Sequence, residues 1–196
     1  MLVFWKERLV YLATPKTGST AIETALAPFA TLAICDPPEL KHTTVQRYRR
    51  FLQPFLGARD SRHFTVLAVM REPVDWLGSW YRYRQRDDIR RADRRTAGLS
   101  FEAFIDGYLA DTPPEYARVG TQSDFLTPSR GAGPDRLFRY ENMPALVRFL
   151  EDRLDRAITL PEANVSPKAA TDLSAETLGK LRRHMDRDFR LYESIA

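Results

Sequence analysis

The chain has 196 residues, of which 43% are hydrophobic and 29% are charged, and its formal net charge is +4. These values predict a single globular domain over residues 1–196 and exclude a disordered or collagen-like chain. The single cysteine excludes an internal disulfide framework. The first apolar stretch contains Lys6, Glu7 and Arg8, and no run of about 18 apolar residues occurs, so we expect a cytoplasmic protein without a signal peptide or a membrane span.

The first part of the chain alternates short apolar runs with helical patterns. In chain order we expect a hairpin turn at Trp5–Arg8, a strand at Leu9–Ala13, a helix from Ser19 to about Pro28, a strand at Thr31–Cys35 and a helix at Thr44–Leu56. The last of these helices places Val45, Tyr48, Leu52 and Phe55 on one apolar face.

The remainder continues the alternation. We expect a buried strand at Phe64–Met70, a helix opened by Pro73 and continuing through the basic run to Arg95, a helix capped by Ser100, a strand at Leu137–Tyr140, a helix capped by Asn142 and a last helix capped by Ser174. Strands that alternate with helices predict an α/β fold with a mostly parallel central sheet flanked by helices.

In such sheets ligands bind beyond the carboxyl ends of the strands. The three most apolar strands are followed by Thr14–Thr20, by Asp36–His42 and by Arg71–Ser79. We therefore expect the functional site to form from these three segments.

The segment Thr14–Thr20 connects a strand to a helix and has the sequence TPKTGST. A glycine allows a tight turn in which backbone N–H groups point into one concavity, and the helix N-terminus adds further donors. Lys16 supplies a positive charge, and Ser19 and Thr20 supply hydroxyl groups, so the segment predicts a phosphate site. The spacing of a Walker A loop is absent, and no acidic partner for magnesium is evident.

Arg71 follows the most buried strand, and Ser79 follows it by eight residues on the helix opened by Pro73. The guanidinium group can bind a phosphate in a bidentate manner. A structural alternative is that Arg71 pairs with a carboxylate such as Glu72, and that Ser79 is a small packing residue.

Together the two motifs resemble the sulfotransferase superfamily. Pro15–Thr20 is similar to its 5′-phosphosulfate loop, and Arg71–Tyr81 is similar to its 3′-phosphate motif. Leu137–Met143 resembles a late strand with an acidic residue, and Asn164–Ser166 resembles a short C-terminal element. The stretch Val119–Gln122 resembles a glutamine-containing segment of the carbohydrate-type members. The chain resembles this branch more closely, although it is short and we expect no membrane anchor.

The resemblance implies a P-loop-nucleotide-kinase-like sulfotransferase fold and 3′-phosphoadenosine 5′-phosphosulfate (PAPS) as the co-substrate. It implies that Lys16, Thr17, Gly18, Ser19 and Thr20 hold the 5′-phosphosulfate, and that Arg71 and Ser79 hold the 3′-phosphate. The implied product is 3′-phosphoadenosine 5′-phosphate (PAP), and no metal is expected.

The acceptor hydroxyl or amine needs a base, and His42 in the second segment can titrate near neutral pH. In the superfamily a histidine or glutamate of the comparable region has this role, so we expect His42 to be catalytic, with Lys16 stabilising the leaving phosphate. Asp36 and Glu39 are alternative bases, whereas His63 and His184 have positions typical of structural or exposed residues.

Two other functions remain open from the sequence. One is a P-loop-like nucleotide phosphotransferase. The other is a nucleic-acid-binding module that uses Arg82–Arg95 and Arg47–Arg50, although we expect no nucleic-acid partner because no recognised motif accompanies these residues. The basic run Arg82–Arg95 is more typical of a solvated helix face. The sequence identifies neither the small-molecule or carbohydrate acceptor nor the oligomeric state.

Overall fold

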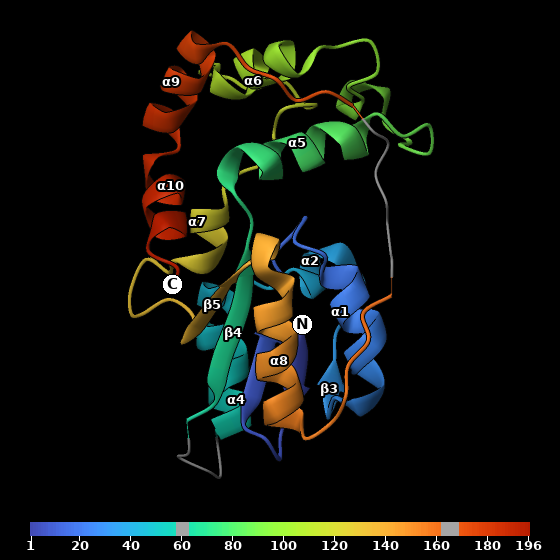
Figure 1. The fold of residues 1–196 in the computed structure, drawn as a ribbon, viewed down its shortest axis with the longest axis vertical. Coiled ribbons are helices and arrows are strands. Elements are labelled where there is room, and N and C mark those ends of the chain that lie inside the picture. The colour runs from blue at the N-terminus through green and yellow to red at the C-terminus, as the bar shows by residue number, and fades with distance from the viewer. Residues whose placement is uncertain (58–62, 162–168) are drawn as a thin grey trace. The chain divides into compact units, whose positions relative to one another are not determined.

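The computed structural model describes residues 1–57, 63–161 and 169–196 (Figure 1). The polypeptide forms two compact units, the first from residues 1–71, 122–163 and 195–196 and the second from residues 72–121 and 164–194. The chain length predicts that both units belong to a single domain, and this stays a prediction. No helix of the described residues is long and apolar enough to cross a membrane.

The first unit contains a five-stranded mixed sheet. Its strands, in spatial order, are β3 (Leu32–Ala33), β1 (Leu2–Phe4), β2 (Leu9–Leu12), β4 (Thr65–Met70) and β5 (Arg136–Arg139). β2, β4 and β5 pair in parallel, and β1 is antiparallel to both β2 and β3. The α/β class and the partly parallel sheet are therefore confirmed. β1 alone points the opposite way among these strands, so the carboxyl ends of the other four lie at one edge.

Two helices cover one face of this sheet, α1 (Ser19–Leu26) and α8 (Met143–Leu154). In Figure 1 α8 lies in front of the strands. Alternate strand residues face the same side of a sheet, and here they form a core with both helices: Leu2, Phe4, Leu9, Tyr11, Leu67 and Val69 from the strands, Ile22 and Leu26 from α1, and Leu146, Leu150 and Leu154 from α8. A 3-10 turn, η1 (Ala27–Phe29), ends α1 near the expected position, and another, η4 (Tyr140–Asn142), precedes α8.

The helical segment after the third strand is not a regular α-helix. It comprises α2 (Pro38–Lys41), α3 (Val45–Arg47), a π-helical turn η2 (Tyr48–Leu52) and α4 (Gln53–Gly57). The wider π-turn shifts the phase of the residues that follow it. Val45 and Tyr48 are fully buried as expected, but Phe55 is 74% exposed and Leu56 is buried in its place. The prediction that Phe55 lies on the apolar face is therefore wrong.

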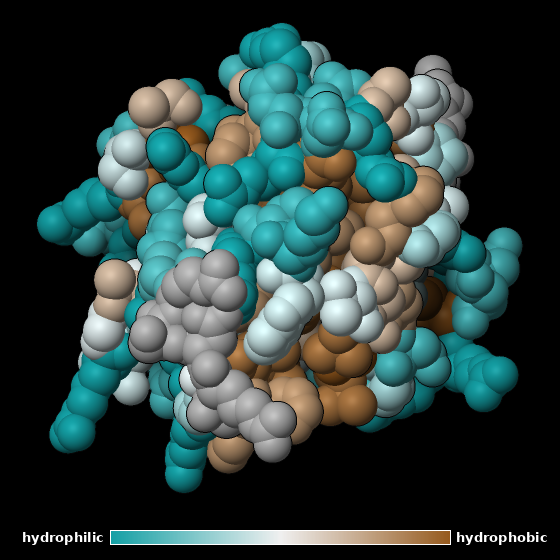
Figure 2. Space-filling model, turned by 90° about the horizontal axis from the view of Figure 1, so that it is seen from below, coloured by the Kyte–Doolittle hydropathy of each residue, from teal (hydrophilic) through white to brown (hydrophobic). Residues whose placement is uncertain are grey.

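Among the residues that the structure describes, the large apolar side chains that remain exposed belong to the first unit: Trp5, Phe29, Leu40, Phe51 and Phe55. Figure 2 shows one face of the molecule, on which hydrophobic residues lie among hydrophilic ones. Scattered exposure of this kind is usual for a protein surface.

The second unit is helical. It contains α5 (Pro73–Arg84), η3 (Ala92–Arg94), α6 (Phe101–Leu109), α9 (Ala175–His184) and α10 (Asp186–Glu193). Ser100 and Ser174 cap α6 and α9 as expected, because each hydroxyl accepts a hydrogen bond from the third residue after it. The last helix, expected to be continuous, is divided at Met185. The core of this unit includes Trp76, Leu77, Tyr81, Phe104, Ile105, Leu181 and Phe189.

The basic run is only partly helical. α5 ends at Arg84, and the expected continuation to Arg95 is wrong because arginines and aspartates two residues apart pair locally instead. Arg86 lies 2.6 Å from Asp88, and Arg91 lies 2.5 Å from Asp93. Arg95 pairs with Asp87, eight residues earlier in the chain. Neighbouring acids thus compensate much of the positive charge, which agrees with a solvated surface and gives no support to a nucleic-acid site here.

Because of the π-turn, we expect substitutions of two adjacent apolar residues to have different effects on the free energy of unfolding. Leu56→Ala should lower the free energy of unfolding by about 2–4 kcal/mol because it leaves a cavity. Phe55→Ala should change it by less than about 0.5 kcal/mol because its ring is mostly exposed. Urea unfolding of the two variants measures both values. Equal losses would show that the helix keeps a regular α-helical phase.

Candidate functional site

The segment Thr14–Thr20 leaves β2 through two left-handed residues. Lys16 has φ = 64° and Gly18 has φ = 72°. A positive φ is unusual for lysine and is common only where the surrounding structure imposes it, often at functional sites. At Gly18 a Cβ atom would lie 3.2 Å from a ring carbon of Tyr140, so this position has little room for a side chain.

The same glycine is the N-cap residue of α1, and within the described chain no side chain caps this helix. The first backbone N–H groups of a helix have no intrahelical partner and can bind an anion. Ser19, the first residue of α1, is mostly buried. The Thr17 hydroxyl donates to the Thr14 carbonyl over 2.9 Å and is completely buried, so it stabilises the turn itself. The geometry of the segment therefore suits an anion held by main-chain donors and Lys16.

Arg71 lies beside this segment, one residue after β4. Its Nη1 atom donates to the carbonyl oxygen of Lys16 over 3.2 Å, and its guanidinium carbon lies 4.3 Å from the ring centre of Tyr140. The first unit thus brings Arg71 together with Lys16 and Gly18, as the two-motif prediction requires. Cation–π contact with Tyr140 holds the guanidinium plane against one wall of the site.

A buried glutamine fixes the backbone of Arg71. The side-chain oxygen of Gln122 accepts from the Arg71 N–H over 2.9 Å, and its Nε2 atom donates to the Arg71 carbonyl over 2.8 Å. Gln122 is fully buried at the start of α7 (Gln122–Leu126). Its amide thus continues the hydrogen bonding of the strand where β4 ends.

His42 is oriented by a main-chain oxygen of the same region. Its Nδ1 atom lies 2.7 Å from the carbonyl oxygen of Ala13. A carbonyl can only accept, so Nδ1 carries the proton and, in the neutral ring, Nε2 keeps its lone pair. Burial lowers the pKa of His42 below its usual 6.5, which favours the neutral ring. This tautomer can accept a proton at Nε2 near neutral pH.

The segment that carries His42 is attached to α1 by an ion-pair cluster. Lys41 Nζ lies 2.6 Å from Glu23 Oε2 and also donates to the Thr20 hydroxyl over 3.3 Å. The Met1 amino nitrogen lies 3.1 Å from the other oxygen of Glu23. Glu23 is only 4% exposed, and a carboxylate at such a depth needs charged partners of this kind. The cluster therefore holds the second predicted segment next to the first.

The other predicted residues differ in their surroundings. Asp36 and Glu39 are exposed, whereas His42 is half-buried and oriented. His63 is exposed and lies 3.1 Å from Asp135, and His184, also exposed, contacts the edge of Tyr108. In the described ranges no three His, Cys, Asp or Glu side chains form a group that could hold a metal ion.

Ser79 belongs to the second unit, where it is buried in α5. Binding of the 3′-phosphate by Ser79 therefore stays a prediction. The segment Asn164–Ser166, predicted to be a C-terminal family element, lies outside the described residues.

Sequence reasoning missed two residues of this site. The only signal for Gln122 was its position in a glutamine-containing segment. Nothing in that segment indicates that its amide binds the Arg71 backbone. Tyr140 was identified only as the end of a strand, but its ring contacts Arg71 and limits the space at Gly18. A tyrosine directly after a parallel strand was the available signal, because it lies at the ligand-binding edge of the sheet.

Comparison of the chain with protein-family models, with curated proteins and with solved structures finds no match. The residues of the site must therefore support a function by their chemistry alone.

Gln122→Leu should destabilise the protein because it leaves the N–H and C=O groups of Arg71 without their partner. We expect a loss of about 2 kcal/mol or more in the free energy of unfolding. Gln46→Leu is the matched control, because this exposed glutamine accepts from the Ser129 N–H over 3.3 Å where water can replace it, and the variant should lose less than about 1 kcal/mol. Equal effects in urea unfolding would contradict the role given to Gln122.

The lowered pKa of His42 predicts a pH dependence of stability. The unfolded chain binds a proton at this histidine more tightly than the folded chain does, so protons favour unfolding. The stability contributed by His42 should be complete above about pH 6.5 and should fall as the pH is lowered from there toward the folded-state pKa. Unfolding measured from pH 5 to pH 8 on wild type and His42→Gln tests this, and parallel profiles for the two proteins would contradict it.

Proposed function

We propose that this protein is a PAPS-dependent sulfotransferase that transfers a sulfuryl group to a hydroxyl or amine of a small-molecule or carbohydrate acceptor. The observation that carries the proposal is the position of an arginine and an oriented neutral histidine at one anion-binding turn. Arg71 donates to the carbonyl of Lys16, and His42 donates to the carbonyl of Ala13, so both contact the backbone at or beside the segment Thr14–Thr20.

The turn fits the 5′-phosphosulfate of the donor. Left-handed Lys16 and Gly18 precede a helix that no described side chain caps, and such a turn offers main-chain donors to an anion. Lys16 adds a positive charge, and the hydroxyl groups of Ser19 and Thr20 lie on the first turn of α1. Arg71 would bind the 3′-phosphate that distinguishes PAPS from ATP, and the role of Ser79, which belongs to the second unit, stays a prediction.

The transfer itself follows from these roles. The acceptor oxygen attacks sulfur in line with the oxygen that bridges sulfur and the 5′-phosphate. A new S–O bond forms while the bridging S–O bond breaks, and PAP departs with the electron pair of that bond. His42 Nε2 takes the acceptor proton, and Lys16 with the main-chain N–H groups stabilises the charge that develops on the leaving phosphate.

Selective binding of PAP tests the donor site. PAP should raise the melting temperature of the wild-type protein in proportion to the logarithm of its concentration, whereas AMP and ADP should have little effect. Arg71→Ala should lose this response because the 3′-phosphate loses its bidentate partner. His42→Ala should keep it, since the histidine serves the acceptor.

The comparison includes ATP with magnesium. Stabilisation by ATP in preference to PAP would favour a nucleotide phosphotransferase, and a response of Arg71→Ala equal to that of wild type would contradict the role assigned to the arginine.

A further inference from the structure

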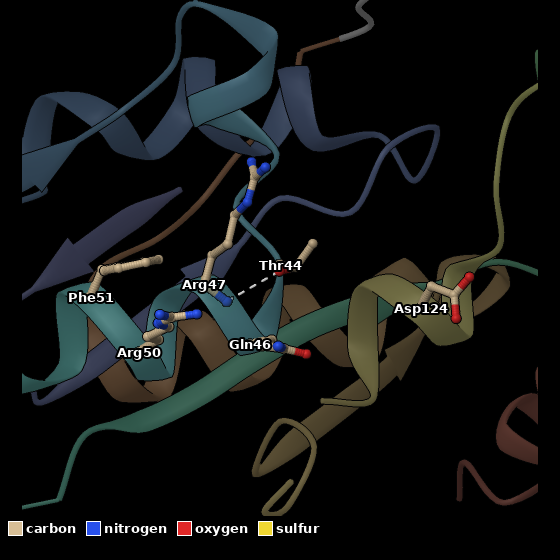
Figure 3. Close-up of a pocket in the computed structure, with 6 residues that line it drawn as sticks. All are labelled: Thr44, Gln46, Arg47, Arg50, Phe51 and Asp124. Atoms are coloured by element: carbon tan, nitrogen blue, oxygen red, sulfur yellow. Dashed lines mark hydrogen bonds between the residues drawn. The ribbon is translucent and has the colours of Figure 1, made fainter. Parts of the chain in front are cut away.

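A polar pocket of about 280 Å³ opens on the first unit (Figure 3). Its lining comes from Thr44, Gln46, Arg47, Arg50, Phe51 and Asp124. All but one of these residues belong to the segment between His42 and the end of the π-turn, and Asp124 comes from α7. None of them has a part in the donor site described above.

Positive and negative side chains lie on different sides of the pocket. Arg47 and Arg50 stand on one wall, and in Figure 3 Asp124 lies on the opposite side, on a different helix. Both arginines are exposed. Arg47 Nη1 donates to the Glu39 carbonyl over 3.3 Å, and the Arg50 guanidinium carbon lies 5.1 Å from the ring centre of Phe51. A guanidinium group has five N–H donors, so these contacts leave donors for an anion.

Most residues that line the pocket follow the proposed base closely in the chain. Thr44 lines it and lies two residues after His42, and its hydroxyl caps α3 by accepting from the Arg47 N–H over 3.2 Å. The Arg47 side chain extends back to α2, the helix that ends immediately before His42. Arg47 and His42 therefore belong to one short segment, Glu39–Arg47, and Arg50 follows this segment in the π-turn.

We infer that this pocket binds the anionic group of an acidic sugar acceptor, a carboxylate or a sulfate, while a hydroxyl of the same sugar faces His42. This inference rests on the proposed function. Arg50 supplies bidentate donors to the anion, and Arg47, whose guanidinium group is directed toward α2, adds positive charge to the same wall. Asp124 repels an anion from the other wall, so it restricts the orientation of the sugar. The Phe51 ring, 63% exposed, offers an apolar surface at the same wall.

Two pairs of probes test the inference by isothermal titration in the presence of PAP. The first pair, p-nitrophenyl β-D-glucuronide and p-nitrophenyl β-D-glucoside, differs only in a carboxylate. The second, N-acetylglucosamine 6-sulfate and N-acetylglucosamine, differs only in a sulfate. We expect the charged member of at least one pair to bind about tenfold more tightly. The pair that shows the difference identifies the anion, and no difference in either pair would overturn the inference.

Substitution of the arginines assigns the effect to this pocket. The double variant Arg47→Gln/Arg50→Gln should bind the charged and neutral members equally. Arg153→Gln removes an exposed arginine from α8 in the same unit and should keep the wild-type preference. A preference that survives in the double variant would overturn the inference. Melting temperatures of all variants show whether each is folded.

The response to PAP separates this inference from the proposed function. Stabilisation by PAP without any preference for the charged sugars would contradict the pocket and leave the donor site supported. A preference for charged sugars in a protein that PAP does not stabilise would support the anion pocket but overturn its role as an acceptor site.

Discussion

Parallel pairing of β2 with β4 sets the position of the polar groups in the first unit. Leu12 is in register with Ala68, so the two strands end side by side, and the turn after β2 lies next to Arg71. β5 pairs with β4 in the same direction, with Met70 opposite Arg139, and this register brings Tyr140 to the same edge. The contacts of Arg71 with Lys16 and Tyr140 follow from these two registers. A shift of one residue in either would reverse the direction of the side chains and separate the groups.

The side chains of the candidate site are positioned mainly by the backbone. His42, Arg71 and Gln122 each bind a main-chain atom at or near the ends of β2 and β4. Main-chain atoms close to the ends of paired strands have less freedom than exposed side chains, so they orient a bound side chain more strictly. The exception is the cluster around Glu23, in which charges compensate one another in a buried place.

The strands and the polar segments after them could be predicted from the sequence because apolar runs and turn residues are local signals. The candidate anion site in the turn after β2 and the adjacent arginine were predicted in this way. The contacts of Gln122 and Tyr140 were not predictable, since each joins residues that lie far apart in the chain and no local pattern records the pairing. Similarly, the helix predicted to reach Arg95 ends at Arg84, where side-chain ion pairs between near neighbours replace helical hydrogen bonds.

The apolar face of the segment after Thr44 shows a different limit. Helical periodicity assumes 3.6 residues per turn, and the π-turn at Tyr48–Leu52 departs from this value, so the prediction holds for Tyr48 and is wrong for Phe55. The same turn carries Arg50 and Phe51, two of the residues that line the pocket.

A π-turn contains one residue more than an α-helical turn can accommodate, so it is the structural equivalent of a single-residue insertion. Deletion of one residue within Tyr48–Leu52 would allow an uninterrupted α-helix, in which the residues after the turn keep the faces that they have now. Leu56 would stay buried and Phe55 exposed after such a deletion, but the local widening that presents Arg50 and Phe51 together would be lost. One codon gained or lost is therefore enough to create or abolish this surface, while the sheet and the turn after β2 keep their sequence.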